Sequence, residues 1–208
     1  MIQTLIFDLD GTLVDSKKDI ADSVNRTLIS LDLPPKELET IYRLIGEGVY
    51  RLIAQAMEGH TEEVEAGVAI FKADYRRHLL DTTTCYGGVP ELLDRLRGRF
   101  LAVVTNKSRE FTIPILEGLG LLDRFDCIIA GDDEWPKKPA PDAMFEVMKR
   151  SSSKQEGTMT IGDNYTDILA GKNAGIATCW ASYGFGRRQE LIPDFTIREP
   201  LELLEIVQ

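Results

Sequence analysis

Short runs of apolar and β-branched residues recur along the chain, and the intervals between most of them are long enough to hold helices. The runs lie at residues 4–9, 100–105, 126–130, 158–161, 177–181 and 195–197. Continuous apolar runs of this length are typical of strands that are buried on both faces of a sheet. Strands that alternate with helices favour an α/β fold, and we expect a doubly wound, Rossmann-like parallel sheet.

The interval after the first predicted strand is too long for an ordinary connection. It covers about 70 residues, whereas a connection between a strand and a helix usually takes roughly 2–6. Its apolar residues recur at helical spacing: Ile20, Val24, Leu28 and Leu31, then Ile41, Leu44, Ile45, Val49, Leu52, Ile53 and Met57. The interval therefore predicts a helical domain inserted into the sheet domain.

The predicted division assigns residues 1–14 and 86–208 to the α/β core and residues 15–85 to a helical cap. We expect hinges near residues 14–18 and 82–88, where the chain passes between the two parts. Two hinges allow a cap to open and close over a site at the edge of the sheet.

The charge balance excludes several kinds of partner. The 208 residues include 24 Lys and Arg against 34 Asp and Glu, which gives a formal net charge of −10. This charge repels a nucleic-acid backbone, and no apolar run approaches the roughly 18 residues of a membrane span. Three widely spaced cysteines favour neither a disulfide framework nor a zinc site. We expect a soluble, cytoplasmic monomer or homodimer that binds neither nucleic acid nor membranes.

Two carboxylates lie at the carboxyl end of the first predicted strand, at a spacing that places them together. Asp8 and Asp10 are two residues apart, so their side chains point to the same face. Like charges this close repel each other unless a cation lies between them, and oxygen ligands suit a hard ion such as Mg²⁺. The alternative is that one carboxylate caps a turn and the other is exposed to solvent.

A second acidic pair follows the predicted strand at 158–161. Asp163 lies at the turn into the next helix, and Asp167 lies in the first turn of that helix. Asp163 could serve only as a helix cap, but its place near Asp8 and Asp10 favours a second metal ligand. We expect Asp167 to act on the site through water or by orienting a neighbour.

Two further segments offer groups that bind phosphate. Thr105, Asn106 and Lys107 lie at the end of the strand predicted at 100–105, where a hydroxyl and the N–H groups of a helix start can hold an anion. Thr105 could equally be a helix cap. Lys138 precedes Pro139 and Pro141, which stiffen the loop and give the lysine a defined direction. A solvated surface lysine is the alternative for Lys138.

These segments, in order and in spacing, resemble the four motifs of the haloacid dehalogenase-like (HAD) hydrolases. The matching residues are Asp8-Leu9-Asp10-Gly11-Thr12, Thr105, Lys138, and Gly162-Asp163 with Asp167. The resemblance covers essentially the whole chain, and the insertion is similar to the helical cap that these proteins carry between motifs one and two. Residues 13–16, 46–48 and 131–142 are most similar to phosphoglycolate phosphatases.

The resemblance implies a Mg²⁺-dependent phosphomonoester hydrolase that acts on a small phosphorylated metabolite, with 2-phosphoglycolate as the first choice. Asp8 would form an aspartyl-phosphate, and Asp10 would protonate the leaving oxygen and later deprotonate water. The implied phosphate-binding residues are Asp8, Leu9, Asp10, Thr105, Asn106 and Lys138, of which Asp8, Asp10, Thr105 and Lys138 are catalytic. The implied metal ligands are Asp8, the main-chain carbonyl of Asp10, and Asp163, with Asp167 behind them.

Three other functions stay open at the level of sequence. A sugar phosphomutase similar to β-phosphoglucomutase would pass the phosphoryl group to a sugar hydroxyl instead of water. A phospho-accepting signalling module also pairs acidic residues with a Thr and a Lys, and a non-catalytic binding protein could keep the same fold. Dehalogenation is disfavoured, because a halide needs no proton from a residue such as Asp10.

The cap carries weaker signals. Arg43 and Arg51 are the residues that we would first test as contacts to a substrate carboxylate, although a solvated helix face is the usual place for an arginine. Gly46 and Gly48 favour a turn that breaks the helix, or a close approach of the cap to substrate. The segment Gly184-Phe185-Gly186 lacks the third glycine of a dinucleotide-binding loop.

Overall fold

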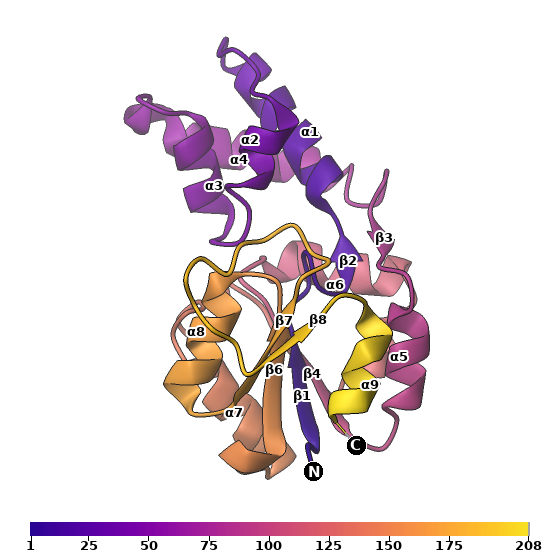
Figure 1. Cartoon of the computed structure of the whole chain (residues 1–208). Coiled ribbons are helices and arrows are strands. Elements are labelled where there is room, and N and C mark those ends of the chain that lie inside the picture. The colour runs from indigo at the N-terminus through magenta and orange to yellow at the C-terminus, as the bar shows by residue number, and fades with distance from the viewer. Residues whose placement is uncertain (208) are drawn as a thin grey trace.

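A six-stranded parallel sheet forms the centre of the molecule in the computed structural model, which describes residues 1–207 (Figure 1). The strand order is β5-β4-β1-β6-β7-β8, and each neighbouring pair is parallel. The strands are β1 (Thr4–Phe7), β4 (Phe100–Val104), β5 (Cys127–Ile129), β6 (Thr158–Gly162), β7 (Ala177–Ala181) and β8 (Phe195–Ile197). Each falls within or close to a predicted run, so the predicted doubly wound sheet is confirmed.

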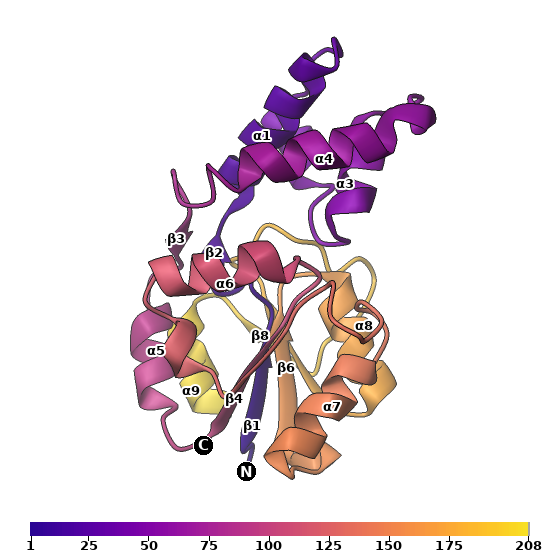
Figure 2. The same ribbon diagram turned by 180° about the vertical axis from the view of Figure 1, so that it is seen from behind.

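Helices cover both faces of this sheet (Figures 1 and 2). They are α5 (Val89–Arg95), α6 (Arg109–Gly118), α7 (Asp142–Ser151), α8 (Tyr165–Ala174) and α9 (Leu203–Ile206). Alternate side chains of β1 pack on opposite sides: Leu5 and Phe7 join the apolar cluster that includes α5, α6 and α9, whereas Ile6 joins the cluster with α7 and α8. The chain also forms short 3₁₀ helices: η1 (Thr61–Glu63), η2 (Leu122–Arg124), η3 (Gln155–Gly157) and η4 (Pro200–Glu202).

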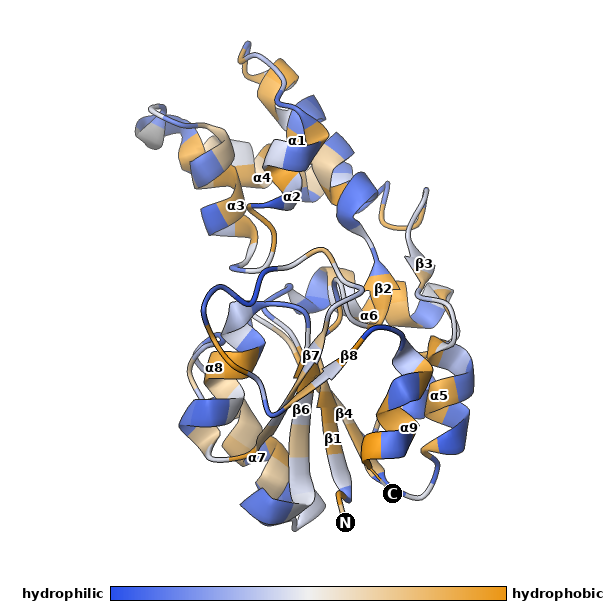
Figure 3. Cartoon of the chain, in the orientation of Figure 1, coloured by the Kyte–Doolittle hydropathy of each residue, from blue (hydrophilic) through white to orange (hydrophobic). Residues whose placement is uncertain are grey.

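Hydropathy follows this layering. In Figure 3, strands β1 and β4 are mostly hydrophobic, whereas the helices alternate hydrophobic and hydrophilic patches, as amphipathic helices do. Within residues 1–207, no helix combines the length and the apolar character that crossing a membrane would require.

Four helices form a separate layer beyond the end of β1 where Asp8 lies (Figures 1 and 2). They are α1 (Lys17–Ser30), α2 (Leu38–Tyr42), α3 (Val49–Ala56) and α4 (Val64–Tyr75). The apolar pattern from Ile41 to Met57 is broken into two helices, because Gly46 and Gly48 adopt positive φ angles of 125° and 92°. Such angles favour glycine and end a helix. The predicted helix-breaking turn is therefore confirmed.

Two short strands carry the chain into this helical layer and back. β2 (Val14–Asp15) pairs in antiparallel fashion with β3 (Thr84–Cys85), with Val14 opposite Cys85. β2 spans the boundary predicted at residues 14/15, and β3 ends at Cys85, next to the boundary predicted at 85/86. The boundaries themselves, at residues 14/15 and 85/86, stay a prediction.

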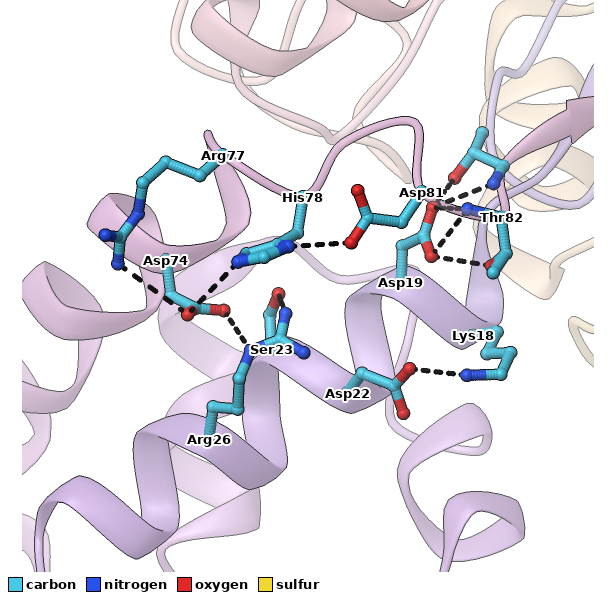
Figure 4. Close-up of polar contacts among 11 residues, drawn as sticks. Lys18, Asp19, Asp22, Ser23, Arg26, Asp74, Arg77, His78, Asp81 and Thr82 are labelled. Carbon is cyan, nitrogen blue, oxygen red and sulfur yellow. Dashed lines mark hydrogen bonds and ion pairs between the residues drawn. The ribbon is translucent and has the colours of Figure 1, made fainter.

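Asp19, in the first turn of α1, ties the two connections together (Figure 4). Its carboxylate accepts hydrogen bonds from the main-chain N–H and the hydroxyl of both Thr82 and Thr83, at 2.6–3.0 Å. Burial raises the pKa of Asp19, but these hydrogen bonds outweigh it and leave the pKa below its ordinary value. The ionised carboxylate therefore fixes the start of α1 to the returning chain.

We expect Asp19→Asn to lower the free energy of unfolding by about 2 kcal/mol, because hydrogen bonds to a charged acceptor are lost. A lowered pKa stabilises the fold above the ordinary aspartate range near pH 4, and this contribution disappears as pH falls through the folded-state value. The deficit should therefore be constant at neutral pH and vanish in acid, as measured by urea unfolding. Asp22→Asn is the matched control, because Asp22 pairs with exposed Lys18, one turn earlier on the same helix. An equal loss in both variants would contradict the role of Asp19.

Candidate active site

The predicted acidic and phosphate-binding residues meet at one edge of the sheet. Asp8 follows β1, Thr105 follows β4 and Asp163 follows β6, and β1 lies between the other two strands. β4 and β5 lie on one side of β1, and β6, β7 and β8 lie on the other, so the strand order reverses at this point. Ligands bind at such a reversal in doubly wound folds. The cavity at this edge is lined by Asp8, Thr105 and Asp163 together with residues of the helical layer.

Asp8 and Lys138 form a buried ion pair. Lys138 Nζ lies 2.8 Å from Asp8 Oδ1, and the Lys138 side chain is only 2% exposed. Burial raises the pKa of Asp8 to about 7 even though the charge of Lys138 acts to lower it. Burial also disfavours the Lys138 ammonium, but the Asp167 and Asp8 carboxylates outweigh it and hold the pKa of Lys138 above its ordinary value. The predicted lysine is thus a fixed cation at the carboxylates.

The main chain around Lys138 is fixed by Asn106. The Asn106 side chain accepts a hydrogen bond from the Lys138 N–H at 2.9 Å and donates to the Lys138 carbonyl at 3.1 Å. It also donates to the carbonyl of Gly46, at 3.0 Å. Because the amide is used in this way, the Asn106 side chain positions Lys138 and the cap loop. The main-chain N–H of Asn106 is then the group left to bind phosphate. The contacts of Asn106 and of Leu9 with phosphate both stay predictions.

Three buried carboxylates gather beside the end of β1. Asp8, Asp163 and Asp167 each offer an oxygen, and these oxygens lie within 4.8 Å of one another. Burial, followed by the charges of Asp8 and Asp167, raises the pKa of Asp163 well above its ordinary value. A divalent cation would relieve this repulsion, and a donor set made only of oxygen fits Mg²⁺. The residues present therefore fit the predicted metal.

Three glycines make room for Asp163. A Cβ on Gly11, Gly184 or Gly186 would lie 1.8, 2.4 or 2.9 Å from an atom of the Asp163 side chain. The N–H of Gly186 donates to Asp163 Oδ2 at 2.6 Å. The segment 184–186, which resembled a fragment of a dinucleotide loop, is therefore a tight cradle for this carboxylate.

Asp167 is occupied by protein partners. One oxygen accepts from Lys138 Nζ at 2.6 Å, and the other accepts from the N–H of Asn164 at 3.0 Å. The second contact is half of a capping box, because the Asn164 side chain caps the start of α8 in return. Asp167 thus orients Lys138 and the β6–α8 turn, in line with the predicted indirect role.

Asp10 points to a different set of partners from Asp8. Lys107 Nζ lies 3.0 and 3.1 Å from the two Asp10 oxygens, and the hydroxyl of Ser16 donates to Oδ1. Lys107 also donates to the hydroxyl of Tyr75 at 2.8 Å, at the end of α4. Sequence reasoning gave no role to the side chains of Lys107, Ser16 and Tyr75. The available signal was a lysine just before the start of α6, at the end of a strand beside the acidic residues.

The arginines expected in the cap do not reach this cavity. Arg51 is exposed and pairs with Glu47, which also accepts a hydrogen bond from the Tyr165 hydroxyl at 2.9 Å. Arg43 lines a neighbouring cavity together with Glu47 and Tyr165, and neither arginine is among the residues that line the cavity at Asp8. The cap instead presents Gly46 to the site, where a Cβ would lie 2.6 Å from the Asn164 amide. The predicted close approach of this loop is therefore to the core residues of the site.

Comparisons with known proteins agree with this geometry. The model of the haloacid dehalogenase-like hydrolase family matches residues 5–181. A phosphoglycolate phosphatase of Aquifex aeolicus is 35% identical over 99% of this chain and 97% of its own length. That of Chromobacterium violaceum is 35% identical over 100% of this chain and 97% of its own length.

A crystal structure of a predicted phosphoglycolate phosphatase from Haemophilus somnus superposes with a TM-score of 0.91 at 28% identity, covering 100% of this chain and 98% of that one. These findings confirm the predicted resemblance to phosphoglycolate phosphatases and the prediction of a phosphatase. The chain belongs to the haloacid dehalogenase-like hydrolase family.

Proposed function

We propose that this chain is a Mg²⁺-dependent phosphomonoester hydrolase whose substrate is 2-phosphoglycolate. The observation that carries the chemistry is the buried pair of Asp8 and Lys138 beside Asp163 at the end of β1. The choice of substrate is supported by the relatives that are named phosphoglycolate phosphatases. A cytoplasmic location and a monomeric or homodimeric state stay predictions.

In the first step, a carboxylate oxygen of Asp8 forms a bond to phosphorus as the bond to the leaving oxygen breaks. Asp10 gives its proton to that leaving oxygen. Lys138 and the Thr105 hydroxyl hold the remaining phosphoryl oxygens and stabilise the charge spread over them. In the second step, water attacks phosphorus, Asp10 takes the proton of that water, and the carboxylate of Asp8 is released.

Asp8, the main-chain carbonyl of Asp10, and Asp163 would hold Mg²⁺. When bound, the ion neutralises charge between the phosphoryl oxygens and the carboxylates. Asp167 serves this site through Lys138, which it holds at 2.6 Å. Asp163 is kept in place by the glycine cradle, so its carboxylate needs little rearrangement to bind a cation.

The helical segment at residues 15–85 acts as a cap that excludes water while the aspartyl-phosphate forms. Support comes from its position over the sheet edge and from the contact of Asn106 with the Gly46 carbonyl. Exclusion of water strengthens every charge interaction inside the site. Residues 1–14 and 86–208 then supply all of the reacting side chains.

The proposal is tested by phosphate release from 2-phosphoglycolate, a hexose phosphate and a nucleoside monophosphate. We expect the highest kcat/KM for 2-phosphoglycolate, with activity lost in EDTA and restored by Mg²⁺. An Asp8→Asn preparation run in parallel exposes any contaminating phosphatase. Activity that survives chelation would contradict the predicted dependence on Mg²⁺. A higher kcat/KM for the hexose phosphate or the nucleoside monophosphate would contradict the proposed substrate. Conversion of a sugar phosphate into its isomer without phosphate release would instead establish a phosphomutase.

A further inference from the structure

The cavity between the core and the helical layer has an uneven distribution of charge. Among the residues that line it, the carboxylates are Asp8, Asp10 and Asp163, and the single cationic side chain is Lys107. Lys138, which pairs with Asp8 and is assigned to the phosphoryl oxygens in the proposed reaction, is not among these lining residues. A substrate with a second negative charge beyond its phosphoryl group therefore meets one cation inside this cavity.

Lys107 is placed where the leaving group must lie. Its ammonium is 3.0 Å from an oxygen of Asp10, the residue that protonates the leaving oxygen in the proposed reaction. A carboxylate whose carbon is two bonds beyond that oxygen is consequently within reach of Lys107. The Tyr75 hydroxyl at 2.8 Å and the Tyr75 ring, 4.7 Å from Nζ to its centroid, hold the ammonium there. The Lys107 side chain is 6% exposed, so its charge is poorly screened by water.

The wall around Lys107 disfavours polyhydroxylated leaving groups. Side chains from the helical layer and from α6 face the cavity with apolar atoms: Val49, Leu52, Phe71 and Phe111. A sugar hydroxyl that is buried against such a wall loses its hydrogen bonds to water without replacement. A short leaving group that ends in a carboxylate has no such hydroxyl, and its charge is matched by the ammonium.

We propose that Lys107 determines substrate choice by binding a carboxylate on the leaving group. This inference rests on the proposed function and deepens it. It names the residue that distinguishes 2-phosphoglycolate from phosphomonoesters of the same size whose leaving group is uncharged. The substrate carboxylate and Asp10 both accept hydrogen bonds from the Lys107 ammonium. The substrate carboxylate takes the place of the Tyr75 hydroxyl, which is the weaker acceptor because it is uncharged. Arg43 and Arg51 take no part in this recognition, since they lie outside the cavity lining.

The test is the ratio of kcat/KM for 2-phosphoglycolate to that for 2-hydroxyethyl phosphate, which ends in a hydroxyl at the same position. We expect Lys107→Met to lower this ratio by roughly 10- to 150-fold, the range for loss of a hydrogen bond to a charged group. Any common loss from disturbing Asp10 affects both esters and cancels in the ratio. Lys107→Arg keeps the cation and should retain most of the preference.

Lys137→Met is the matched control, because it removes an exposed ammonium that lies outside the cavity lining yet close to Gly48 of the cap loop. The ratio of the two kcat/KM values should be the same for Lys137→Met as for the wild type. An equal loss on both esters in Lys107→Met would overturn the selective role of Lys107 while leaving the proposed function intact. A wild-type enzyme that prefers 2-hydroxyethyl phosphate would overturn the proposed substrate itself.

Discussion

Asp8→Asn should abolish turnover, with a loss of at least about 10⁴-fold in kcat, the scale on which removal of a catalytic nucleophile acts. The amide has the size of the carboxylate but cannot attack phosphorus in the same way. Phosphate release under single-turnover conditions measures the loss. Mass spectrometry of the wild type after rapid acid quenching should find the phosphoryl group on the peptide that contains Asp8.

The substitution is expected to leave the fold intact, and pH provides the check. Burial raises the pKa of Asp8 to about 7 in the folded chain. A raised pKa means that the stabilising contribution is present below the ordinary aspartate range and is lost as pH rises through about 7. Without metal, the wild type should therefore lose stability toward alkaline pH, and Asp8→Asn should lose less. Turnover that persists in a folded Asp8→Asn protein would remove Asp8 as the nucleophile.

Asp15→Asn is the control for Asp8→Asn. Asp15 lies on β2 and pairs with Lys17 at 3.3 Å, away from Lys138. The Asp15→Asn substitution removes the same formal charge as Asp8→Asn, from the same region of the chain. The activity of Asp15→Asn should stay within about threefold of the wild type, because this partly exposed pair does not touch the reacting groups.

Lys138→Met should reduce both activity and stability. It removes the cation from Asp8 and Asp167 and leaves two carboxylates buried without a partner ammonium. Breaking a buried ion pair costs about 3–5 kcal/mol, and loss of a charged donor to the phosphoryl oxygens should lower kcat by about 10²- to 10³-fold. Urea unfolding and phosphate release measure the two effects on the same preparation.

The stability deficit of Lys138→Met should narrow as pH falls. Without Lys138, Asp8 takes up a proton more readily, and a protonated carboxyl is less costly to bury than a charged one. Urea unfolding at mildly alkaline and mildly acidic pH separates this effect from a packing defect, which would not depend on pH. Lys137→Met again serves as the control, because the neighbouring Lys137 is exposed. Full activity of Lys138→Met would show that Lys138 does not contact the phosphoryl group.

The strands and the positions of Asp8, Thr105 and Asp163 followed from local pattern. A strand buried on both faces must be apolar along its length, so polar residues stand out at its end. In a parallel sheet these ends meet at one edge, and the residues after β1, β4 and β6 are brought together without further information. The helical insertion was equally visible, because its length exceeded any ordinary connection.

The partners of the site were not visible in the same way. Arg51 lies on α3 near the cavity but pairs with Glu47, whereas Lys107 reaches Asp10 and Tyr75 from a position just before α6. Both are cations, and no local pattern distinguishes them. Their different roles depend on which side chains the packing of helix on sheet brings within a few ångströms.

The sequence by itself determined the fold class, the order of the motifs, the edge of the sheet at which they meet, and the family. Only the tertiary structure decided that Asn106 and Asp167 position Lys138, that Gly11, Gly184 and Gly186 cradle Asp163, and that Lys107 is the cation facing the leaving group. Hydrophobic periodicity is a property of neighbours in the chain, whereas these contacts join residues that are remote in sequence. Their geometry exists only once the sheet and the helical layer have packed together.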